Sequence, residues 1–307
     1  VPDRRIFTVV GTARLSGRAS DAVRDSVLGV ADDDVQATSS LRLSGSRDAR
    51  ASSALDGDAT TAWSSAFGRA EGEWITVRTA EPHTFNRLDL QAVADGVHSV
   101  PTRLEIRVDG KVVATPTLPA VQDATEAGHV VKIPVEFAAT TGQVLEVEVL
   151  DSRTVASVDW TSAQPIAHPF AIAELGVAGL RPSRPEATFD DKCRDDLVTV
   201  DGKAVPVRVV GSTSDALAGR PLDLVSCGSE IDLTDGDHEV RTAAGIDPGM
   251  DVDQIVLESS AASGHTATDD VAGSRASDVG QVRVVNSDPD QVTATLSGLT
   301  PGVPVWL

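Results

Sequence analysis

Oxygen-bearing side chains gather in residues 51–63, which read ASSALDGDATTAW, and they are the strongest chemical signal in the sequence. Asp56, Asp58 and Thr61 lie around a glycine, so a tight turn can direct several of their oxygens to one point. Hard cations such as Ca²⁺ take about six to eight oxygens from carboxylates, main-chain carbonyls and hydroxyls. Glu174, in the apolar run AIAELGV, offers a further carboxylate that a neighbouring strand would bring to the turn. The pattern indicates a cation site, and the alternative is an acidic turn between strands, which acidic proteins contain in quantity.

Strands must position these residues, because apolar and polar side chains alternate along much of the chain. Leu104, Ile106 and Val108 alternate with charged residues and end at an Asp-Gly pair, a strong signal for a hairpin. The same alternation covers residues 74–78 and 144–149. Short strands with turn residues between them predict an all-β chain built from sandwiches or jelly rolls.

The strings around the acidic turn resemble the discoidin family, also called F5/8 type C domains. LDGDATTAW is followed by WITV, RLDLQ, PTRLEIRVDGK and IAELGV, and the resemblance covers residues 36–180. It implies a galactose-binding-like jelly roll with a structural Ca²⁺ in the turn, and it places Trp63 where the family keeps an aromatic that supports the loop. The implied side-chain ligands are Asp56, Thr61 and Glu174. The implied main-chain carbonyl ligands are those of Ser53, Asp58, Thr61 and Ala173.

Members of the discoidin family bind glycans, phospholipid head groups or proteins, so the fold alone does not name a ligand. A sugar needs an apolar platform together with hydrogen-bonding groups. The family places such groups on loops at one end of the barrel, where the candidates are Phe67, Arg69, Asp95 and His98, with Trp160 and His168 as secondary candidates. In the alternative interpretation Phe67 belongs to the core and Arg69 and Asp95 form a surface ion pair. Because the chain has no tyrosine and few aromatics, we expect weak glycan binding.

The chain divides into four parts by composition. Residues 1–35 hold one strand and a stretch of helical spacing, and this segment is available to pack on the second sandwich. The module of residues 36–180 is followed by the Pro-containing linker 181–187. Residues 188–307 predict a second β-sandwich that we expect to be truncated at its C-terminus. Within it, residues 259–278 are rich in Ser, Ala, Gly and Asp and predict a long loop.

The charge balance limits the partners. The chain has 26 basic and 46 acidic residues, which gives a net charge of −20 at pH 7. Nucleic acids and anionic membrane surfaces both require Lys or Arg patches. We therefore expect no nucleic-acid partner and no direct membrane insertion by this chain, and a preference for divalent cations and neutral ligands.

Two cysteines, Cys193 and Cys227, both fall in the second half of the chain. Only one pairing is possible, and a disulfide would indicate an exported protein because cytosolic thiols stay reduced. The alternative is two buried free thiols. The spacing does not suggest a zinc site.

A second resemblance covers most of the chain. HSVPTRL, CRDDLVTVDGKAVPVRV, CGSEIDLTDGDHEVRTAAG and DVDQIVLES occur in that order. They resemble the C-terminal periplasmic region of actinobacterial (mycobacterial-type) cell-wall arabinofuranosyltransferases. Those are large membrane glycosyltransferases that build arabinan and carry carbohydrate-binding modules after a multi-spanning catalytic part. The resemblance implies a periplasmic location for this region, tethered to the membrane through the parent enzyme.

The chain itself is not expected to be an enzyme, since it contains no G-x-S-x-G elbow, P-loop or H-E-x-x-H motif. Both ends of the sequence look cut, so we expect a fragment of a larger protein. The favoured function is a non-catalytic carbohydrate-binding region of the parent glycosyltransferase, with cell-wall glycan (arabinan or arabinogalactan type) and the rest of the parent as partners. The alternatives are a structural or protein-interaction scaffold of the same parent and an accessory module of a glycosidase.

Overall fold

The structure is a computed structural model in which the chain divides into two compact units, Val1–Ser259 and Ser260–Leu307. Within the described residues of the second unit, β19 (Gln281–Asp288) pairs with β20 (Gln291–Ser297) as a hairpin. The predicted loop at 259–278 lies outside the described residues beyond its first position, as does the expected truncated end at 298–307. The described residues are 4–30, 34–180, 184–190, 192–228, 230–259, 281–288 and 291–297.

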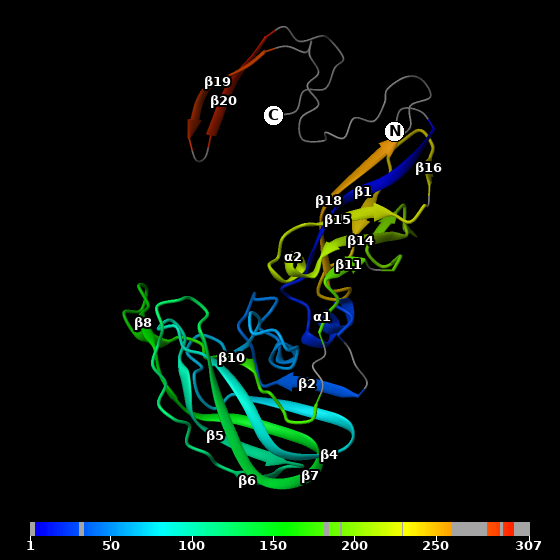
Figure 1. Cartoon of the computed structure of the whole chain (residues 1–307). Coiled ribbons are helices and arrows are strands. Elements are labelled where there is room, and N and C mark those ends of the chain that lie inside the picture. Colours follow the sequence, from blue (N-terminus) through cyan, green and yellow to red (C-terminus); the bar gives the residue numbers. More distant parts are fainter. Residues whose placement is uncertain are drawn as a thin grey trace. The chain divides into compact units, whose positions relative to one another are not determined.

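The all-β prediction is confirmed, and a seven-stranded antiparallel sheet forms the larger part of the first unit (Figure 1). Its order is β3-β10-β4-β7-β5-β6, and β2 pairs with β4. The bounds are β2 (Val35–Ser39), β3 (Trp63–Ser64), β4 (Trp74–Val93), β5 (Val100–Val108), β6 (Lys111–Ala114), β7 (Val130–Arg153) and β10 (Ala171–Glu174).

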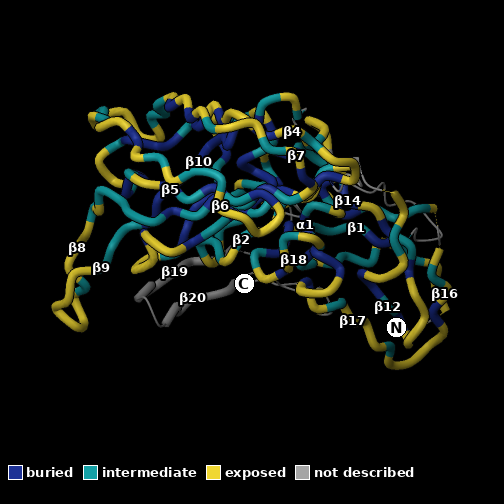
Figure 2. Tube along the Cα trace, turned by 90° about the horizontal axis from the view of Figure 1, so that it is seen from below, coloured by how far each residue is buried: buried dark blue, intermediate teal, exposed yellow. Residues whose placement is uncertain are grey.

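The long strands β4 and β7 bend, so one sheet supplies both layers of a jelly-roll sandwich. The register of the β4–β7 pair is interrupted between residues 78 and 83 and again between residues 85 and 87, and such irregularities bend a strand pair. Ile75 before the bend and Leu88 after it are both fully buried in the same hydrophobic cluster. The core therefore lies between the two halves of the sheet, as the dark-blue segments of Figure 2 show.

The Asp-Gly turns form as the sequence predicts. Asp109 and Gly110 have φ of 46° and 76°, and they join β5 to β6. Positive φ at both central residues is the requirement of the hairpin turn that matches strand twist, and Asp-Gly meets it at low cost. Asp201 and Gly202, with φ of 49° and 74°, repeat this geometry between β12 (Val198–Val200) and β13 (Lys203–Ala204).

The N-terminal segment joins the second sandwich. In the six-stranded sheet of order β11-β14-β15-β1-β16, β1 (Arg5–Leu15) pairs with β15 (Leu222–Ser226), β16 (Ile231–Leu233) and also β18 (Met250–Ser259). A smaller sheet has the order β13-β12-β17. The other elements of this part of the chain are β11 (Thr188–Asp190), β14 (Val207–Ser212), β17 (Val240–Thr242), α1 (Asp21–Val27) and α2 (Thr213–Leu217).

Two buried arginines fix the N-terminal segment to the chain that leads into the acidic turn. Arg24 of α1 donates from Nη1 to the carbonyl oxygen of Ser46 at 3.0 Å. Arg50 donates from Nε to Asp25 Oδ1 at 2.8 Å. Both arginines are fully buried, and removing one partner of a buried ion pair leaves an uncompensated charge. The path of the chain into the turn is therefore tied to α1.

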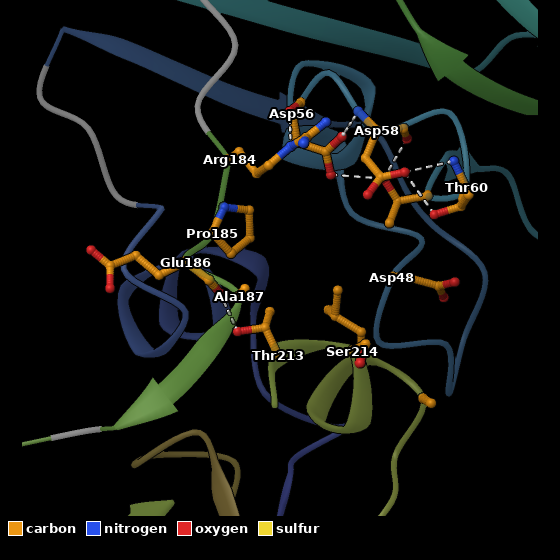
Figure 3. A pocket seen from close by; sticks show the side chains of 13 residues that line it. Asp48, Asp56, Asp58, Thr60, Arg184, Pro185, Glu186, Ala187, Thr213 and Ser214 are labelled. Carbon is orange, nitrogen blue, oxygen red and sulfur yellow. Dashed lines mark hydrogen bonds between the residues drawn. The ribbon is translucent and has the colours of Figure 1, made fainter. Parts of the chain in front are cut away.

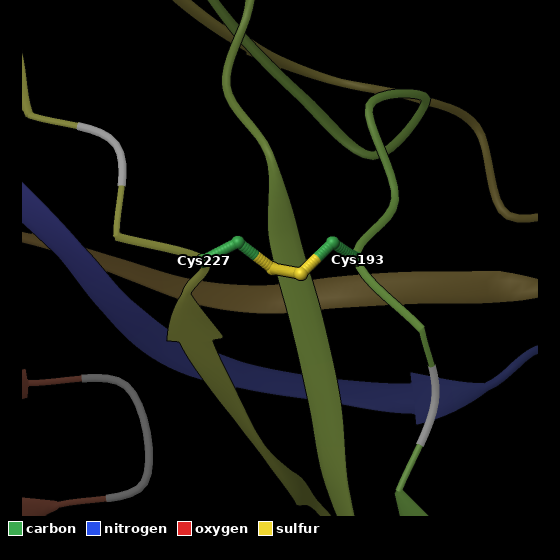
Figure 4. Close-up of a disulfide and its surroundings, with 2 residues drawn as sticks. All are labelled: Cys193 and Cys227. Atoms are coloured by element: carbon green, nitrogen blue, oxygen red, sulfur yellow. A yellow bond between two sulfur atoms is a disulfide. The ribbon is translucent and has the colours of Figure 1, made fainter.

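A disulfide joins Cys193 to Cys227 in the second sandwich, with a Cα–Cα distance of 6.0 Å (Figure 4). Cys227 directly follows β15, and its main-chain N–H donates to the carbonyl oxygen of Pro206 at 3.1 Å. The bond attaches the segment before β12 to the central sheet. Among the described residues, no helix is both long and apolar enough to span a membrane.

Candidate functional site

Four oxygens converge in the acidic turn. The hydroxyl oxygen of Thr61 lies 2.7 Å from Asp56 Oδ2, 3.0 Å from the carbonyl oxygen of Asp58 and 3.5 Å from that of Ser53. One hydroxyl carries one proton, so it cannot satisfy three acceptors at once. Ser53 belongs to the short 3₁₀ helix Ala51–Ala54, which brings its carbonyl to the turn. The surplus of acceptors around one point is what a cation requires.

The closing strand β10 carries a bulge beside this turn. Ile172 pairs with Ala92 and Glu174 pairs with Gln91, so Ala173 is an extra residue without a register partner on β4. A bulge takes one residue out of the ladder and re-aims its neighbours. The main-chain N–H of the next residue, Leu175, donates to the carbonyl oxygen of Ala54 at 2.8 Å. The strand end is thus held against the turn, and Ala173 lies outside the regular β10–β4 register.

Trp63 anchors the end of the acidic turn in the hydrophobic core. It is fully buried, and its indole Nε1 donates to the carbonyl oxygen of Leu41 at 3.1 Å. Its ring packs edge-to-face on Phe170, with a centroid distance of 5.1 Å. The burial of Trp63 and these two contacts therefore fix the position of the chain where it leaves the turn.

The residues present fit a Ca²⁺ ion. Within the described part of the chain, the buried oxygens Glu174 Oε1 and Ser53 Oγ have no hydrogen-bond partner. Burial, and after it the charge of Asp56, raises the pKa of Glu174 to about 7. The described residues contain no cluster of three or more His, Cys, Asp and Glu side chains suited to a metal. An ion here would depend on hydroxyl and carbonyl oxygens as much as on carboxylates, which is the donor set that Ca²⁺ takes.

Arg184 covers the outer side of the turn (Figure 3). Its Nε donates to the carbonyl oxygen of Asp56 at 3.3 Å, and its Nη2 donates to that of Gly57. Beside it lies a cavity of about 480 Å³ between the turn and α2. The lining includes Asp48, Asp58, Thr60, Glu186, Thr213 and Ser214. The turn therefore faces the linker and the second sandwich.

Three loops meet at a different place on the module. The main-chain N–H of Gly68 donates to the carbonyl oxygen of Ala167 at 2.7 Å, and that of Ser99 donates to Pro169 at 3.0 Å. The Ser99 hydroxyl also donates to the carbonyl oxygen of His168 at 2.7 Å. The loops that carry Phe67, His98 and His168 are joined by these bonds.

The exposed Phe67 and the half-buried His168 form an aromatic pair on this loop surface. Their rings stack edge-to-face with a centroid distance of 5.6 Å, and Phe67 is 57% exposed. Both ring nitrogens of His168 are occupied, Nδ1 by the carbonyl oxygen of Val97 at 2.7 Å and Nε2 by Ser157 Oγ at 2.9 Å. Phe67 is thus an apolar surface on a fixed support, and its assignment to the core does not hold.

Residues 34–166 match the family model of the F5/8 type C domain. This segment is an F5/8 type C domain. The matched range ends before β10, yet β10 pairs with β3 and β4 inside the same sheet, so the domain extends at least to Glu174. The discoidin resemblance of the sequence is confirmed.

The chain is also similar in fold to the solved structures of arabinofuranosyltransferase AftD from Mycobacteria. One of them is 17% identical with a TM-score of 0.61, and the match covers 96% of this chain and 20% of that one. A mutant form gives a TM-score of 0.62 at 17% identity, covering 86% of this chain and 20% of that one. The chain spans about a fifth of the length of these structures. No curated protein matches the sequence.

The buried carboxylate of Asp95 holds a loop of the F5/8 type C domain in place through hydrogen bonds. Its side chain is only 3% exposed. Its oxygens accept from the main-chain N–H groups of Val97, His98 and Gly128 and from His98 Nδ1, each at 3.0 Å. Burial opposes ionisation, but these donors outweigh it and hold the pKa of Asp95 well below its usual range. Asp95 has little capacity left for a ligand, whereas the His98 ring is partly exposed.

Arg69 follows Phe67 by two residues and pairs with Glu73, with 3.0 Å between Nε and Oε1. The Arg69 side chain is 61% exposed and that of Glu73 only 4%. The ion pair that the alternative interpretation assigns to Arg69 and Asp95 does not form, because each residue has another partner. A guanidinium held at one end and open to solvent can still contact a ligand.

Sequence reasoning missed three features of the F5/8 type C domain: the bulge at Ala173, the cover by Arg184 and the supporting role of His168. The bulge and the supporting imidazole leave no local pattern in the sequence. The cover by Arg184 does have a signal in the sequence. The linker RPSRPEA contains two arginines, and in an acidic chain a basic residue is expected to pair with an acidic segment such as the turn.

Proposed function

We propose that this chain is a non-catalytic glycan-binding region of a cell-wall arabinofuranosyltransferase. The observation that carries the binding role is the exposed Phe67 ring on its fixed His168 support, on the loops of an F5/8 type C domain. The fold likeness to AftD over 96% of the chain supports the parent. The catalytic step belongs to the parent, and the role of this region is to hold the glycan acceptor or product.

The surface suits a neutral sugar chain such as arabinan or an arabinogalactan-type oligosaccharide. Phe67 supplies a platform for the apolar face of a ring, and His98 and Arg69 supply polar groups for hydroxyls. Asp95 acts as a positioning residue behind His98. Each hydroxyl hydrogen bond contributes about 0.5 to 1.5 kcal/mol net. Because the platform is shallow and the hydrogen bonds are few, a dissociation constant in the high micromolar to millimolar range, or about −4 to −5.5 kcal/mol, is expected.

We further propose a structural Ca²⁺ in the acidic turn. The side chains of Asp56, Thr61 and Glu174 and the main-chain carbonyls of Ser53, Asp58, Thr61 and Ala173 would hold it. When bound, the ion supplies positive charge that neutralises buried carboxylates and ties the turn to β10. The orphaned oxygens of Glu174 and Ser53 support this role.

The proposed location is the periplasmic side of the cell envelope, with attachment to the membrane through the parent. The disulfide Cys193–Cys227 supports an oxidising compartment. The net charge of −20 keeps the region in solution beside an anionic membrane surface rather than on it.

A scaffold role within the same parent is the second candidate. It is favoured by the burial of Arg24 and Arg50 between the N-terminal segment and the F5/8 type C domain, which makes the first unit a rigid support. The third candidate, an accessory module of a glycosidase, predicts that the parent cleaves the glycan that this region binds. The sequence that surrounds the chain in its full-length protein separates this candidate from the first.

Calorimetric titration with arabinan oligosaccharides tests the binding role. We expect wild-type protein to bind and Phe67→Ala to lose at least tenfold in affinity. Ile246→Ala is the matched control, because Ile246 is 51% exposed on the second sandwich and lies outside the loop surface. If the wild type binds no cell-wall sugar at millimolar concentration, the glycan-binding role is wrong and the scaffold role takes its place.

A further inference from the structure

One hairpin of the F5/8 type C domain carries an indole almost entirely in solvent. The hairpin consists of β8 (Ala156–Val158) and β9 (Pro165–Ala167), and Figure 2 shows it as a largely exposed arm. Trp160 at its turn is 93% exposed, and Val158 beside it is 69% exposed. A large aromatic in this position gives nothing to the core, so folding of the domain does not explain it.

The turn that presents Trp160 is held by several bonds. Asp159 Oδ2 accepts from the main-chain N–H of Ser162 at 3.0 Å and from its hydroxyl at 2.6 Å. The main-chain N–H of Asp159 donates to Gln164 at 2.9 Å, and that of Ala163 donates to Asp159 at 2.8 Å. A rigid turn reduces the entropy lost when its aromatic binds a partner. This is the property of a binding anchor rather than of a loose loop.

The hairpin starts at the proposed glycan surface. Ser157 Oγ contacts His168 Nε2 at 2.9 Å, and His168 supports Phe67. Trp160 lies three residues beyond Ser157, past the end of β8 and in the turn at the tip of the hairpin. Phe67 and Trp160 are therefore linked through His168 and the β8–β9 hairpin.

The surroundings of Trp160 match a neutral, hydroxyl-rich occupant. Thr161 and Gln164 are exposed on the same turn and offer hydroxyl and amide groups beside the indole. No lysine or arginine lies between residues 154 and 180, and the chain carries a net charge of −20. An anionic lipid surface would be repelled rather than attracted. An extended glycan that continues from the loop surface fits these groups.

We propose that Trp160 is a second sugar platform, so that the F5/8 type C domain selects a glycan of several linked units over a single sugar. The inference rests on the proposed glycan-binding function and adds the chain-length preference of that site. Phe67 binds the first position, and the β8–β9 hairpin carries the contact onward along the chain. Trp160 contributes only when the ligand is long enough to reach it.

An affinity series with arabinan oligosaccharides from two to six units tests the proposal. For the wild type we expect at least a fivefold gain in affinity between the shortest and the longest ligand. Trp160→Ala should bind the disaccharide as the wild type does and lose the gain with length, and Trp160→Phe should retain part of it. Phe67→Ala should bind every length more weakly. Val112→Ala, a change at a residue 53% exposed on β6, is the control.

The outcomes are distinguishable. Wild-type protein that binds no oligosaccharide removes the proposed function, and the second platform falls with it. Wild-type binding whose length dependence persists in Trp160→Ala overturns the second platform and leaves the proposed function intact. An equal loss at all lengths in Trp160→Ala also overturns it, because Trp160 then belongs to the primary site. Co-sedimentation of wild-type protein with neutral or anionic phospholipid vesicles, lost in Trp160→Ala, would assign the hairpin to lipid instead.

Discussion

Arg184 donates from Nε to the main-chain carbonyl oxygen of Asp56 at 3.3 Å, and the carboxylate of the same Asp56 accepts from Thr61 inside the turn. The guanidinium thus holds the turn from its outer side, while the oxygen cluster lies inside it. The positive charge of Arg184 also opposes the rise in the pKa of Glu174 that burial and Asp56 cause. The linker therefore contributes directly to the order of the turn.

Removal of Arg184 should loosen the turn. In Arg184→Ala we expect faster hydrogen exchange at the amides of Asp58 and Thr61, by about tenfold, because two hydrogen bonds that hold the turn are lost. Arg241→Ala is the matched control, since the Arg241 side chain lies in an exposed ion pair with Glu239, away from the turn. Unchanged exchange in Arg184→Ala would show that the turn is ordered without the linker.

Calcium should raise the thermal stability of the wild type and not that of Glu174→Gln. An ion at 100 times its dissociation constant adds about 2.7 kcal/mol to the free energy of unfolding. EDTA should reverse the gain. If the thermal unfolding midpoint of the wild type is the same with calcium and with EDTA, the proposed calcium site is wrong.

In the absence of calcium, Glu174→Gln should be more stable than the wild type at pH 8. The pKa of Glu174 is raised from 4.5 to about 7 in the folded protein, so stability falls as the pH rises from 4.5 to about 7, and the full penalty is present at pH 8. The glutamine keeps the shape and removes that charge, and we expect its calcium-free midpoint to rise by about 3 °C. A lower calcium-free midpoint in Glu174→Gln would contradict the claim that burial beside Asp56 disfavours the charged form of this carboxylate.

Asp95→Asn should destabilise the domain and remove part of its acid sensitivity. An asparagine cannot accept all the hydrogen bonds that the Asp95 carboxylate accepts, and the loss should cost about 1 to 3 kcal/mol at pH 7. The folded pKa lies below the usual value of about 3.9, so the stabilisation is complete above pH 4 and is lost as the pH falls below it. Urea unfolding from pH 2 to pH 7 measures both effects. Parallel curves for the two proteins below pH 4 would show that Asp95 does not titrate as stated.

The strands and the calcium-loop candidates follow from local sequence, because alternation and Asp-Gly turns act over a few residues. Leu104 and Ile106 are buried as their alternation predicts, and Asp56, Thr61 and Glu174 meet although 113 residues separate the last two. The loop surface was only partly predictable. Asp95 has the right type for a sugar ligand but is satisfied from inside, since three main-chain N–H groups converge on it. Such satisfaction depends on folded geometry that spacing does not encode.

Reduction of the Cys193–Cys227 disulfide should destabilise the second sandwich selectively. A cross-link across 34 residues stabilises by about 4 kcal/mol on the chain-entropy estimate. In Cys193→Ser/Cys227→Ser we expect faster hydrogen exchange in β14 and β15, with Ile75 and Val77 of β4 as the internal control. A mass measurement on native, unreduced protein that shows two free thiols would contradict the disulfide.

The central claim is that the loops around Phe67 bind a cell-wall glycan, and chemical-shift mapping tests it most directly. In a titration of isotope-labelled protein with arabinan hexasaccharide, the account predicts progressive shifts at the amides of Gly68, Val97 and Ser99 and in the β8–β9 hairpin. It predicts no shifts at Asp58 or Thr61 in the acidic turn. Shifts confined to the turn and α2, or no shifts at millimolar ligand, would contradict the claim.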